Sequence, residues 1–574
     1  MKTSTMACAA AGFLLASGFS AHAETESHGK KNPHRHPPSR PAGPSRALNS
    51  LTAEVQDLRG QVQTLQEQIK AQSAVQAQTQ AQVQQAAASA TAAQQTIQTV
   101  KDEDAQAAAS AIQSIPTQVA SAVEAARTNS DALYYKGLTI TPGGFLELSN
   151  QYRSRALGSD MFSPFASIPF KSSASAHESE DRFSARQSRM SLLVQGDVNP
   201  GTKVAMYGEI DFLGAAQSAN YTESNSFNPR LRNLYATIDW NNSGWHLLAG
   251  QSWSLATLNT NGITPRNELP PPMIDAQFIP GFVWTRQPQI RITKDFNKTF
   301  WLALSVESPQ TTFSGTPPAG VIVAIPNSTG LYAGATGATA PADAGGGTPA
   351  IPTAGTSSLN SIPDVVGKAA YEGKIAGRSV HAEVFGLGRG FNERIGNSNE
   401  TVYGGGVGAG LVVAVIPNLI DLQASMLTGR GIGRYGASQL PDVTFSPTGR
   451  LKPIEETDWL AGATLHATKT LDLYVFAGEE SEGRQAYTPN IGLGSPQLNL
   501  AGCYTEGGAC AAATNFVEQG TVGFWDKIYQ GSFGRVQVGV QYSYTERHAF
   551  SGLNGLTPVT NDNIVFGSLR YYPF

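Results

Sequence analysis

Three short segments of the sequence place charged residues at alternating positions between apolar ones. Arg189 alternates with Met190, Leu192 and Val194, Arg291 lies between Ile290 and Ile292, and Glu209 and Asp211 lie on the opposite parity from Val204, Met206 and Ile210. A guanidinium group stays charged and offers a fixed fork of donors that suits a carboxylate. Arginines on one polar face would therefore attract anions, although acids on the same face make the field mixed. The alternative is that these arginines only pair with the acids and brace the fold.

Residues for covalent or metal chemistry are not grouped in the sequence. The histidines stand singly, and no Ser-His-Asp or Cys-His spacing can be assembled from His177, His246, His381, His466 and His548. The run GGGVGAG at 404–410 lacks the GKS/T ending of a phosphate loop, and glycine in a strand usually marks close packing or a kink. We therefore expect no enzymatic activity, no cofactor and no metal site.

Cys503 and Cys510 predict a disulfide. They are separated by six residues in a stretch rich in Gly and Ala, and the third cysteine, Cys8, lies in the N-terminal apolar segment. An even pair in such a stretch indicates a loop disulfide formed in an oxidising compartment. A metal-binding pair is a weaker interpretation, because no histidine or further cysteine lies close by.

The composition limits the class of protein. Only 15% of the 574 residues are charged, 59 are glycine, and the net charge is -4 without a long basic tract. An ordinary soluble domain has about 25% charged residues, and a nucleic-acid partner would call for a basic patch. The longest apolar run after the N-terminus, GAGLVVAVIP at 408–417, is about half of what a membrane helix needs. The chain is therefore either soluble after export or crosses a membrane as strands.

The first 47 residues predict export followed by a linker. Lys2 opens a short basic region, ACAAAGFLLASGF at 7–19 is apolar, and AHA at 21–23 fits a cleavage site, so residues 1–23 are expected to be a signal peptide. The apolar segment is too short for a membrane anchor, which is the weaker alternative. Residues 24–47 are rich in Pro and basic residues and predict an extended linker.

A heptad repeat begins at Leu48 and predicts a coiled coil over 48–86. Val and Ile recur at the first core position and Leu at the second, through Leu48, Leu51, Val55, Leu58, Val62, Leu65 and Ile69. The pattern predicts an oligomer, but Gln in later core positions leaves the number of strands open. A lone Ala-rich helix is the alternative. Residues 87–136 stay rich in Ala and Gln and predict a helix or spacer without a core.

From about residue 137 the hydrophobic period changes to two. In GGFLELSNQYRS, for example, Leu146, Leu148 and Tyr152 alternate with Glu147, Ser149, Gln151 and Arg153. Tight turns such as NPGT at 199–202 and NNSG at 241–244 alternate with long connections at 156–181, 254–281 and 308–362. Short turns on one side and long loops on the other are typical of a transmembrane barrel. We therefore predict an all-β transmembrane barrel of about sixteen antiparallel strands over 137–574.

The last residues support the same interpretation. Phe574 and Tyr572 resemble the C-terminal signal of outer-membrane barrels, in which the last strand ends on Phe with an aromatic residue two positions earlier. Arg570 departs from the apolar residue expected before them.

Several of these segments, taken together and in order, resemble the DcaP-like outer-membrane porins. The resemblance rests on RQSRMSLLVQGDV, KVAMYGEIDF, NPRLRNLYATIDW, HLLAGQSWSL and RQPQIRIT, after a signal peptide and a coiled coil, and is densest between Gly144 and Asp295. It implies a homotrimer of sixteen-stranded barrels with periplasmic coiled-coil helices, and a pore for small anions such as dicarboxylates. Arg230, Arg232 and Arg286 lie in the matching motifs. Their parity is that of the apolar positions, so facing the interior would require a bulge or a place beyond the lipid band.

The loop SLATLNTNGITPRNELPPPMIDAQFIPG at 254–281 is the candidate for a constriction. It is long, stiffened by Pro and third in order, where general porins fold a loop inward, and Arg266, Glu268 and Asp275 are its charged residues. An ordinary surface loop is the alternative. We expect a passive diffusion channel in the outer membrane of a Gram-negative cell, in contact with lipid and inserted by the barrel-assembly machinery. An adhesin or anchor with a plugged barrel is the alternative function.

Overall fold

A computed structural model describes residue 60 and residues 132–214, 227–315, 318, 360–395 and 397–574. The expected signal peptide, linker, coiled coil and Ala/Gln-rich segment lie almost entirely outside these residues and stay predictions. The described chain consists of antiparallel strands and short 3-10 turns. Among the described residues, no helix has the length and apolar character that a bilayer span requires.

The strands of the barrel wall follow one another along the chain. They are β2 (Leu138–Arg153), β3 (Glu180–Ser184), β4 (Arg189–Asn199), β5 (Thr202–Asp211), β6 (Arg230–Trp240), β7 (Trp245–Trp253), β8 (Arg286–Phe296), β9 (Phe300–Glu307), β10 (Asp364–Ile375), β11 (Arg378–Ile395), β12 (Ser398–Ile416), β13 (Ile420–Arg430), β16 (Glu455–His466), β17 (Leu471–Glu482), β20 (Thr514–Gly531), β21 (Gly534–Ala549) and β22 (Val559–Tyr572). The short strand β1 (Leu133–Tyr135) pairs with the start of β2. Two separate pairs of short strands lie outside the wall: β14 (Val443–Phe445) with β15 (Leu451–Pro453), and β18 (Gln485–Thr488) with β19 (Ile491–Leu493).

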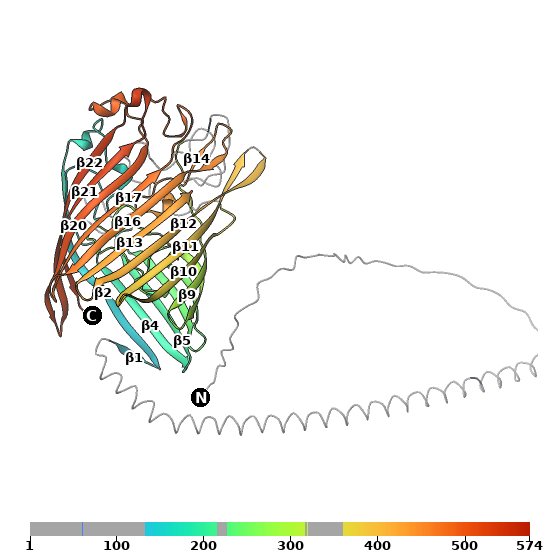
Figure 1. Cartoon of the computed structure of the whole chain (residues 1–574), viewed down its shortest axis with the longest axis vertical. Helices are drawn as coiled ribbons and strands as arrows, with labels where there is room; N and C mark the ends of the chain where they lie inside the picture. Colours follow the sequence, from blue (N-terminus) through green and yellow to red (C-terminus); the bar gives the residue numbers. More distant parts are fainter. Residues whose placement is uncertain (1–59, 61–131, 215–226, 316–317, 319–359, 396) are drawn as a thin grey trace, which may run out of the picture. The chain divides into compact units, whose positions relative to one another are not determined.

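The wall closes on itself. Each strand pairs with its neighbours in the chain, and β22 returns to pair antiparallel with β2, from Leu146 opposite Tyr571 to Arg153 opposite Ile564. β3 and β4 both pair with β2 and form two parts of one wall strand. The result is a closed barrel of sixteen antiparallel strands, as the alternation predicted, and Figure 1 shows the strands tilted around it. Closure removes the free sheet edges that would otherwise expose unpaired backbone groups.

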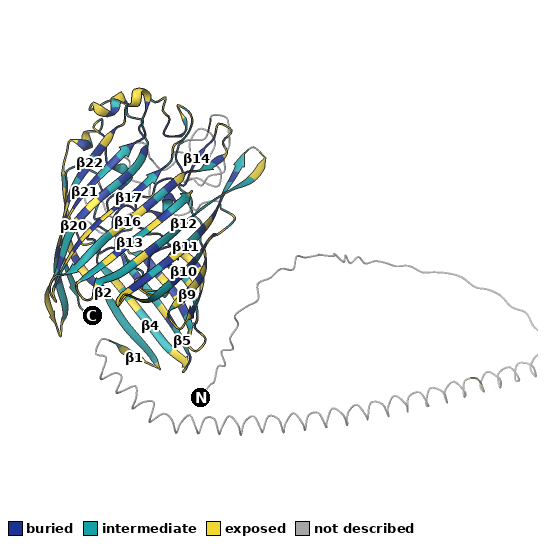
Figure 2. Cartoon of the chain, viewed as in Figure 1, coloured by how far each residue is buried: buried dark blue, intermediate teal, exposed yellow. Residues whose placement is uncertain are grey.

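The two faces of the wall differ as the two-residue period predicts. In β2, Leu146, Leu148 and Tyr152 point outward and are exposed, whereas Glu147, Ser149 and Gln151 are buried in the interior. β9 alternates without exception between exposed and buried residues, and Figure 2 shows the same alternation across the wall. The outward residues are mostly apolar, and this is the arrangement that lipid favours on the outside of a barrel.

The connections also follow the prediction, with one exception. One end of the barrel carries tight turns at 200–201, 241–244, 297–299, 376–377, 417–419, 467–470 and 532–533, and the other end carries the long connections. The exception is the connection between β11 and β12, which has only residues 396 and 397 between strands of 18 and 19 residues. We call the two ends the short-turn end and the loop end.

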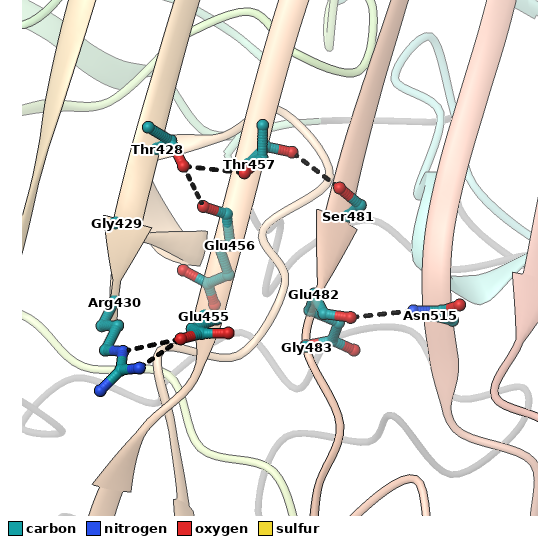
Figure 3. Close-up of a pocket in the computed structure, with 10 residues that line it drawn as sticks. All are labelled: Thr428, Gly429, Arg430, Glu455, Glu456, Thr457, Ser481, Glu482, Gly483 and Asn515. Carbon is teal, nitrogen blue, oxygen red and sulfur yellow. Dashed lines mark hydrogen bonds and ion pairs between the residues drawn. The ribbon is translucent and has the colours of Figure 1, made fainter.

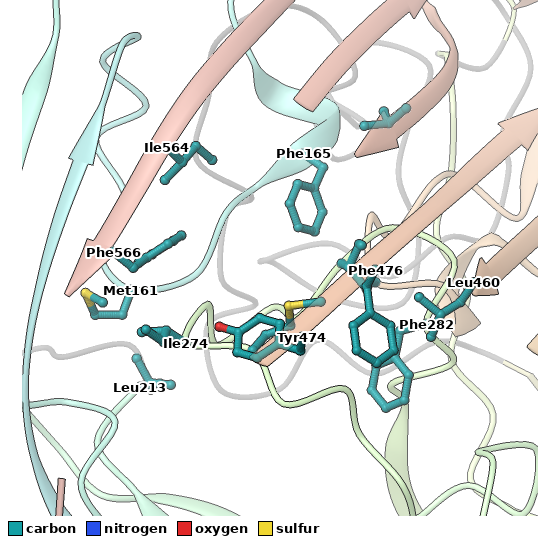
Figure 4. Packing of buried hydrophobic residues seen from close by; sticks show 14 of the residues in the cluster. Met161, Phe165, Leu213, Ile274, Phe282, Leu460, Tyr474, Phe476, Ile564 and Phe566 are labelled. Carbon is teal, nitrogen blue, oxygen red and sulfur yellow. The ribbon is translucent and has the colours of Figure 1, made fainter. Parts of the chain in front are cut away.

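Part of the interior is packed like a protein core. The loop at 254–285, which we call the inner loop, contributes Met273, Ile274, Ile279 and Phe282. They form one cluster with wall residues that include Trp525. Figure 4 shows Ile274 and Phe282 of this cluster with Tyr474, Phe476 and Phe566 of the wall. Burying one such side chain contributes about 1.5–3 kcal/mol. These contacts hold the inner loop inside the barrel, and an ordinary surface loop is therefore not what the chain forms here.

The side chains of β22 that share the parity of Tyr572 point into the barrel. Phe566 is fully buried in the interior cluster, and the Tyr572 ring lies 5.2 Å from that of Phe145 on the inner face. Val565 and Leu569 take the outward positions. Arg570, which departed from the expected apolar pattern, is therefore an interior residue, and its charge has a polar partner there.

Candidate functional site

A network of arginines and carboxylates covers the inner face of neighbouring strands from β22 through β2 to β8. We call it the arginine wall, and it consists of Glu147, Arg189, Glu209, Asp211, Arg230, Arg232, Arg286 and Arg570. Its members come from strands that follow one another around the barrel. The pairing register therefore brings together residues that lie far apart in the sequence.

A bulge brings Arg230 and Arg232 to the interior. The register between β5 and β6 shifts at Glu209 and Ile210, so that Arg232 and Asn233 on β6 are both buried. Both nitrogens of the Arg230 fork donate to Asp211, at 2.9 and 2.8 Å. Arg232 donates to Glu209 at 2.6 Å and to Asp211 at 2.8 Å. The bulge resolves the parity conflict of the sequence, because an extra residue reverses the side on which the following side chains point.

The other arginines of the wall have looser partners. Arg189 lies 3.8 Å from Glu209 and faces the Phe145 ring, and Arg570 forms an ion pair with Glu147 at 2.9 Å. Arg286 lies over the Trp253 ring, 4.6 Å from its centroid, and its Nη1 has no hydrogen-bond partner among the described residues. Five guanidinium groups thus meet three carboxylates, which leaves the arginine wall with an excess of positive charge.

Water reaches part of the arginine wall. The side chains of Arg230 and Arg189 are 33% and 28% exposed, whereas that of Arg232 is 4% exposed. Arg232 therefore holds the two carboxylates together, and Arg189 and Arg230 present charge to the solvent-filled space. A wall of this kind can attract anions without burying them.

Arg291 faces the interior but lacks this access. Its guanidinium donates to Gln289 at 3.0 Å and to the backbone oxygen of Trp253 at 2.6 Å, and the residue is buried. Alternation predicts the direction of this side chain correctly, but the side chain is buried. A parity rule cannot detect such burial, because it depends on residues from other parts of the chain.

The three charged residues expected in the constriction have separate environments. Arg266 approaches the arginine wall, where it donates to the Tyr235 hydroxyl at 3.4 Å and lies 5.8 Å from the Tyr207 ring. Glu268 pairs through its backbone with Asn259, and burial raises the pKa of its carboxyl. Asp275 is buried and forms hydrogen bonds that hold the inner loop in place.

Asp275 anchors the inner loop to the first long connection. Its carboxylate accepts hydrogen bonds from the Ser163 hydroxyl at 2.5 Å, the Ser163 backbone at 3.2 Å and the Gln277 backbone at 2.8 Å. Burial raises the pKa of this carboxyl to about 6. The residue is therefore part of the internal packing, and this corrects its expected place among the residues that face the solute.

A second charged group lies on the other side of the ring of strands. We call it the carboxylate wall; it consists of Glu456, Asp458 and Glu480, which are all buried on the inner face of β16 and β17. Its hydrogen bonds come from loop backbones: Ile432 donates to Glu456 at 2.5 Å, and Gly281 and Ser438 donate to Glu480 at 2.7 and 2.9 Å.

Glycine allows the inner loop to approach the carboxylate wall. Gly281 has a φ of +86°, and a Cβ added to it would collide with the backbone oxygen of Trp459. Gly478 meets the inner loop in the same way, because an added Cβ would collide with the backbone oxygen of Pro280. The inner loop and the connection after β13, which contains Ile432 and Ser438, therefore cover this wall together.

A polar cavity of about 570 Å³ lies at the loop ends of β13, β16, β17 and β20. Figure 3 shows its lining, in which Arg430 pairs with Glu455 and the Thr428 and Thr457 hydroxyls lie 2.8 Å apart. Asn515 donates to the backbone oxygen of Glu482 at 2.8 Å. The cavity lies at strands β13 to β20, away from the strands that carry the arginine wall.

Cys503 and Cys510 form a disulfide in the long connection between β17 and β20, at the loop end. Cys503 is buried with Phe170, Leu500 and Ala549. The bridge closes the small loop that the spacing of the two cysteines predicted.

Sequence reasoning missed two members of the arginine wall. Arg570 was set aside as a departure from a terminal motif, and Glu147 was placed only on a polar face. A signal existed, because Arg570 has the parity of the buried Phe566 and Ser568. Their partnership depends on the closing pair of β2 and β22, in which Glu147 lies opposite Arg570.

Comparisons with known proteins give a fold. No family model matches the sequence, and no curated protein matches it. The solved outer membrane channel DcaP of Acinetobacter baumannii has a TM-score of 0.54 to this chain at 18% identity, covering 76% of this chain and 99% of that chain. An anion-selective porin from Comamonas acidovorans has a TM-score of 0.39 at 11% identity, with 76% and 99% covered. OmpT of Vibrio cholerae has 0.37 at 10%, with 77% and 99% covered.

Of these three, only the DcaP structure exceeds a TM-score of 0.5. The likeness establishes that the chain has the porin fold.

Proposed function

We propose that the protein is an outer-membrane diffusion channel for small anionic solutes, with dicarboxylates as the expected class. The observation that carries this proposal is the arginine wall, where Arg189 and Arg230 keep contact with solvent beside a net excess of positive charge. The outward apolar face of the barrel supports a place in lipid, and the predicted signal peptide supports export. The likeness of the fold to a solved outer membrane channel agrees with membership of the DcaP-like porins.

The expected assembly is a homotrimer inserted by the barrel-assembly machinery, with the coiled coil of residues 48–86 in the periplasm. The heptad supports an oligomer of some order. Cross-linking of the purified protein in detergent, with and without residues 48–86, tests both points. A truncated protein that forms the barrel but loses the trimer supports the division into two modules.

Reversal potentials in a planar bilayer under a KCl gradient test the channel itself. We expect the parent to prefer anions, and the double variant Arg189→Ala, Arg230→Ala to lose that preference, because three guanidinium groups then meet three carboxylates and the excess positive charge of the wall is gone. Arg291→Ala is the matched control, since this buried arginine should not change the selectivity. A parent that prefers cations, or an equal effect in the control, contradicts the proposed role of the arginine wall.

The alternative function, an adhesin or anchor with a plugged barrel, makes a different prediction in the same experiment. Such a protein would insert into the bilayer without carrying current. The observation that favours this alternative is the inner loop, whose side chains fill part of the interior.

A further inference from the structure

Three interior histidines each lie between two carboxylates. We call these groups the histidine clamps: His246 with Asp239 and Asp295, His381 with Glu372 and Glu383, and His466 with Asp421 and Asp472. In the sequence these histidines stand alone. Strand pairing brings their partners from adjacent strands, and the same arrangement recurs three times.

The contacts are short on both sides of each ring. Nδ1 lies 2.7 Å from Asp239 in the first clamp, 2.8 Å from Glu372 in the second and 2.6 Å from Asp472 in the third. Nε2 lies 3.1 Å from Asp295, 3.0 Å from Glu383 and 3.2 Å from Asp421, respectively. An ionised carboxylate only accepts hydrogen bonds, so both ring nitrogens must donate. Only the imidazolium form satisfies all these contacts, since a neutral ring would direct a lone pair at a carboxylate.

The clamps lie on the inner face at the short-turn end. His246 follows the turn at 241–244, and His466 ends β16 just before the turn at 467–470. His381 is the fourth residue of β11, which follows the turn at 376–377. The backbone N–H of its partner Glu372 donates to the backbone oxygen of Thr299 in a neighbouring turn. The three clamps therefore form an arc from β6 to β17 around one mouth of the barrel.

Few other charged groups face the clamps. Lys368 on β10 donates to Glu383 at 2.6 Å, and Lys527 on β20 pairs with Asp472 at 2.9 Å. The Trp301 ring stacks on His246, and from the inner loop the Gly262 backbone donates to Glu372 at 2.9 Å. Six carboxylates thus face two ammonium groups and three imidazolium groups, for a net charge of -1. Loss of the three imidazolium protons changes that charge to -4.

We propose that the histidine clamps make the charge of this mouth depend on pH, so that the barrel admits anions best in acid and less well as the pH rises. This proposal rests on the channel function proposed above. Three charges change at one mouth while the arginine wall keeps its own, because guanidinium groups do not lose their protons in this range. The mouth then opposes anion entry while the wall still attracts anions.

Selectivity measured as a function of pH tests the proposal. The full-length protein is placed in a planar bilayer under a KCl gradient from about pH 5 to about pH 9, the range in which imidazole groups change charge. We expect the anion preference of the parent to fall several-fold over this range. The triple variant His246→Gln, His381→Gln, His466→Gln should lose the dependence.

The other two histidines of the barrel supply a matched control. His177 lies in a long connection, where its Nε2 meets the Lys171 backbone oxygen. His548 lies at the loop end with Phe516 stacked on its ring, and its Nε2 alone faces carboxylates, Glu546 at 3.0 Å and Glu518 at 3.9 Å, so it is not held between two of them. The variant His177→Gln, His548→Gln should keep the full pH dependence. A parent with no pH dependence, or a triple variant that retains it, overturns the proposal.

A measurement without current separates this proposal from the channel function and from a folding defect. ¹⁵N shifts of the histidine rings in the parent protein in micelles report how many ring nitrogens carry protons. At about pH 6 we expect both nitrogens of His246, His381 and His466 to be protonated. A neutral clamp ring at that pH overturns the proposal, whereas protonated rings in a barrel that carries no current at any pH overturn the channel function alone.

Discussion

The arginine wall and the carboxylate wall both place charged side chains on the inner face of the barrel, yet they have different environments. Arg232 on the first wall joins Glu209 and Asp211 side by side, and its neighbours Arg189 and Arg230 meet solvent. Glu480 on the second wall receives backbone hydrogen bonds from Gly281 and Ser438. The charges of the first wall are paired by side chains and stay open to solvent, whereas those of the second wall are capped by loop backbone and closed off.

A charged side chain that points into the barrel is therefore not always in contact with the path of the solute. The inner loop is attached to the carboxylate wall through Glu480, and beside the first wall it contacts Tyr235 through Arg266 and Gln187 through the backbone oxygen of Ile274. The distribution of loop contacts therefore decides which charges a solute meets. The variants below test this division.

The largest expected effect is the loss of Arg232. Arg232→Ala leaves Glu209 and Asp211 buried side by side, and removing one partner of a buried ion network costs about 3–5 kcal/mol. The loss of stability is measured as a lower urea concentration at the unfolding midpoint, with the mobility of the folded barrel on a gel as the readout. Arg230→Ala is the matched control and should cost less, because its side chain is partly exposed and Asp211 keeps Arg232. Equal losses in the two variants would contradict the central place of Arg232.

The second effect concerns the cap on the carboxylate wall. Gly281→Val introduces a Cβ that collides with the Trp459 backbone oxygen and a residue that disfavours a φ of +86°. We expect the inner loop to leave this wall, so that single-channel conductance rises and anion preference falls. Gly555→Val is the control, because Gly555 has a φ of +74° in a long connection with open space around it. An unchanged conductance in Gly281→Val would show that this contact does not set the width of the path.

The third effect is a pH dependence of the inner loop. The pKa of Asp275 in the folded protein is about 6, above the ordinary value of about 3.9 for the unfolded chain. Above pH 6 the ionised carboxylate therefore lowers the free energy of unfolding, by up to about 3 kcal/mol. This destabilisation decreases as the pH falls from the pKa of the folded protein towards the pKa of the unfolded chain. We expect hydrogen exchange in residues 254–285 to slow between about pH 7.5 and about pH 5, after correction for intrinsic rates.

Asp275→Asn removes the titrating group and should make this protection independent of pH. Persistence of the dependence in the variant would assign it to another residue.

The smallest effect is expected at Asp458. Asp458→Asn should leave the reversal potential of the parent unchanged, because the inner loop covers the carboxylate wall. In the Gly281→Val background the same substitution should restore part of the anion preference. A shift in the parent background would show that solutes reach this wall without any movement of the loop.

Strand content and the direction of most side chains were predictable from the sequence. Alternation in β2 and β9 depends on neighbouring residues only, and the burial of Glu147 and Ser149 beside the exposed Leu146 and Leu148 follows it. The spacing of Cys503 and Cys510 likewise predicted a bridge that the structure contains. The coiled coil of 48–86 stays a prediction.

The candidate site was predictable only in part. Arg189, Glu209 and Asp211 were found by parity, whereas Arg230 and Arg232 conflicted with it until the bulge in β6 was known. Arg291 has the predicted direction but is covered, and Asp275 holds the inner loop instead of facing a solute. A bulge and a covering loop are invisible to a rule that counts residues by twos.

The sequence by itself determined the period of two, the positions of the turns and the residue types on each face, because these depend on contacts between near neighbours in the chain. Only the tertiary structure decided that Arg570 meets Glu147, that three single histidines each lie between two carboxylates, and which wall the inner loop seals. The physical reason is closure: a sheet that pairs its last strand with its first sets side chains hundreds of residues apart opposite one another, and the register of those pairs is a property of the whole ring.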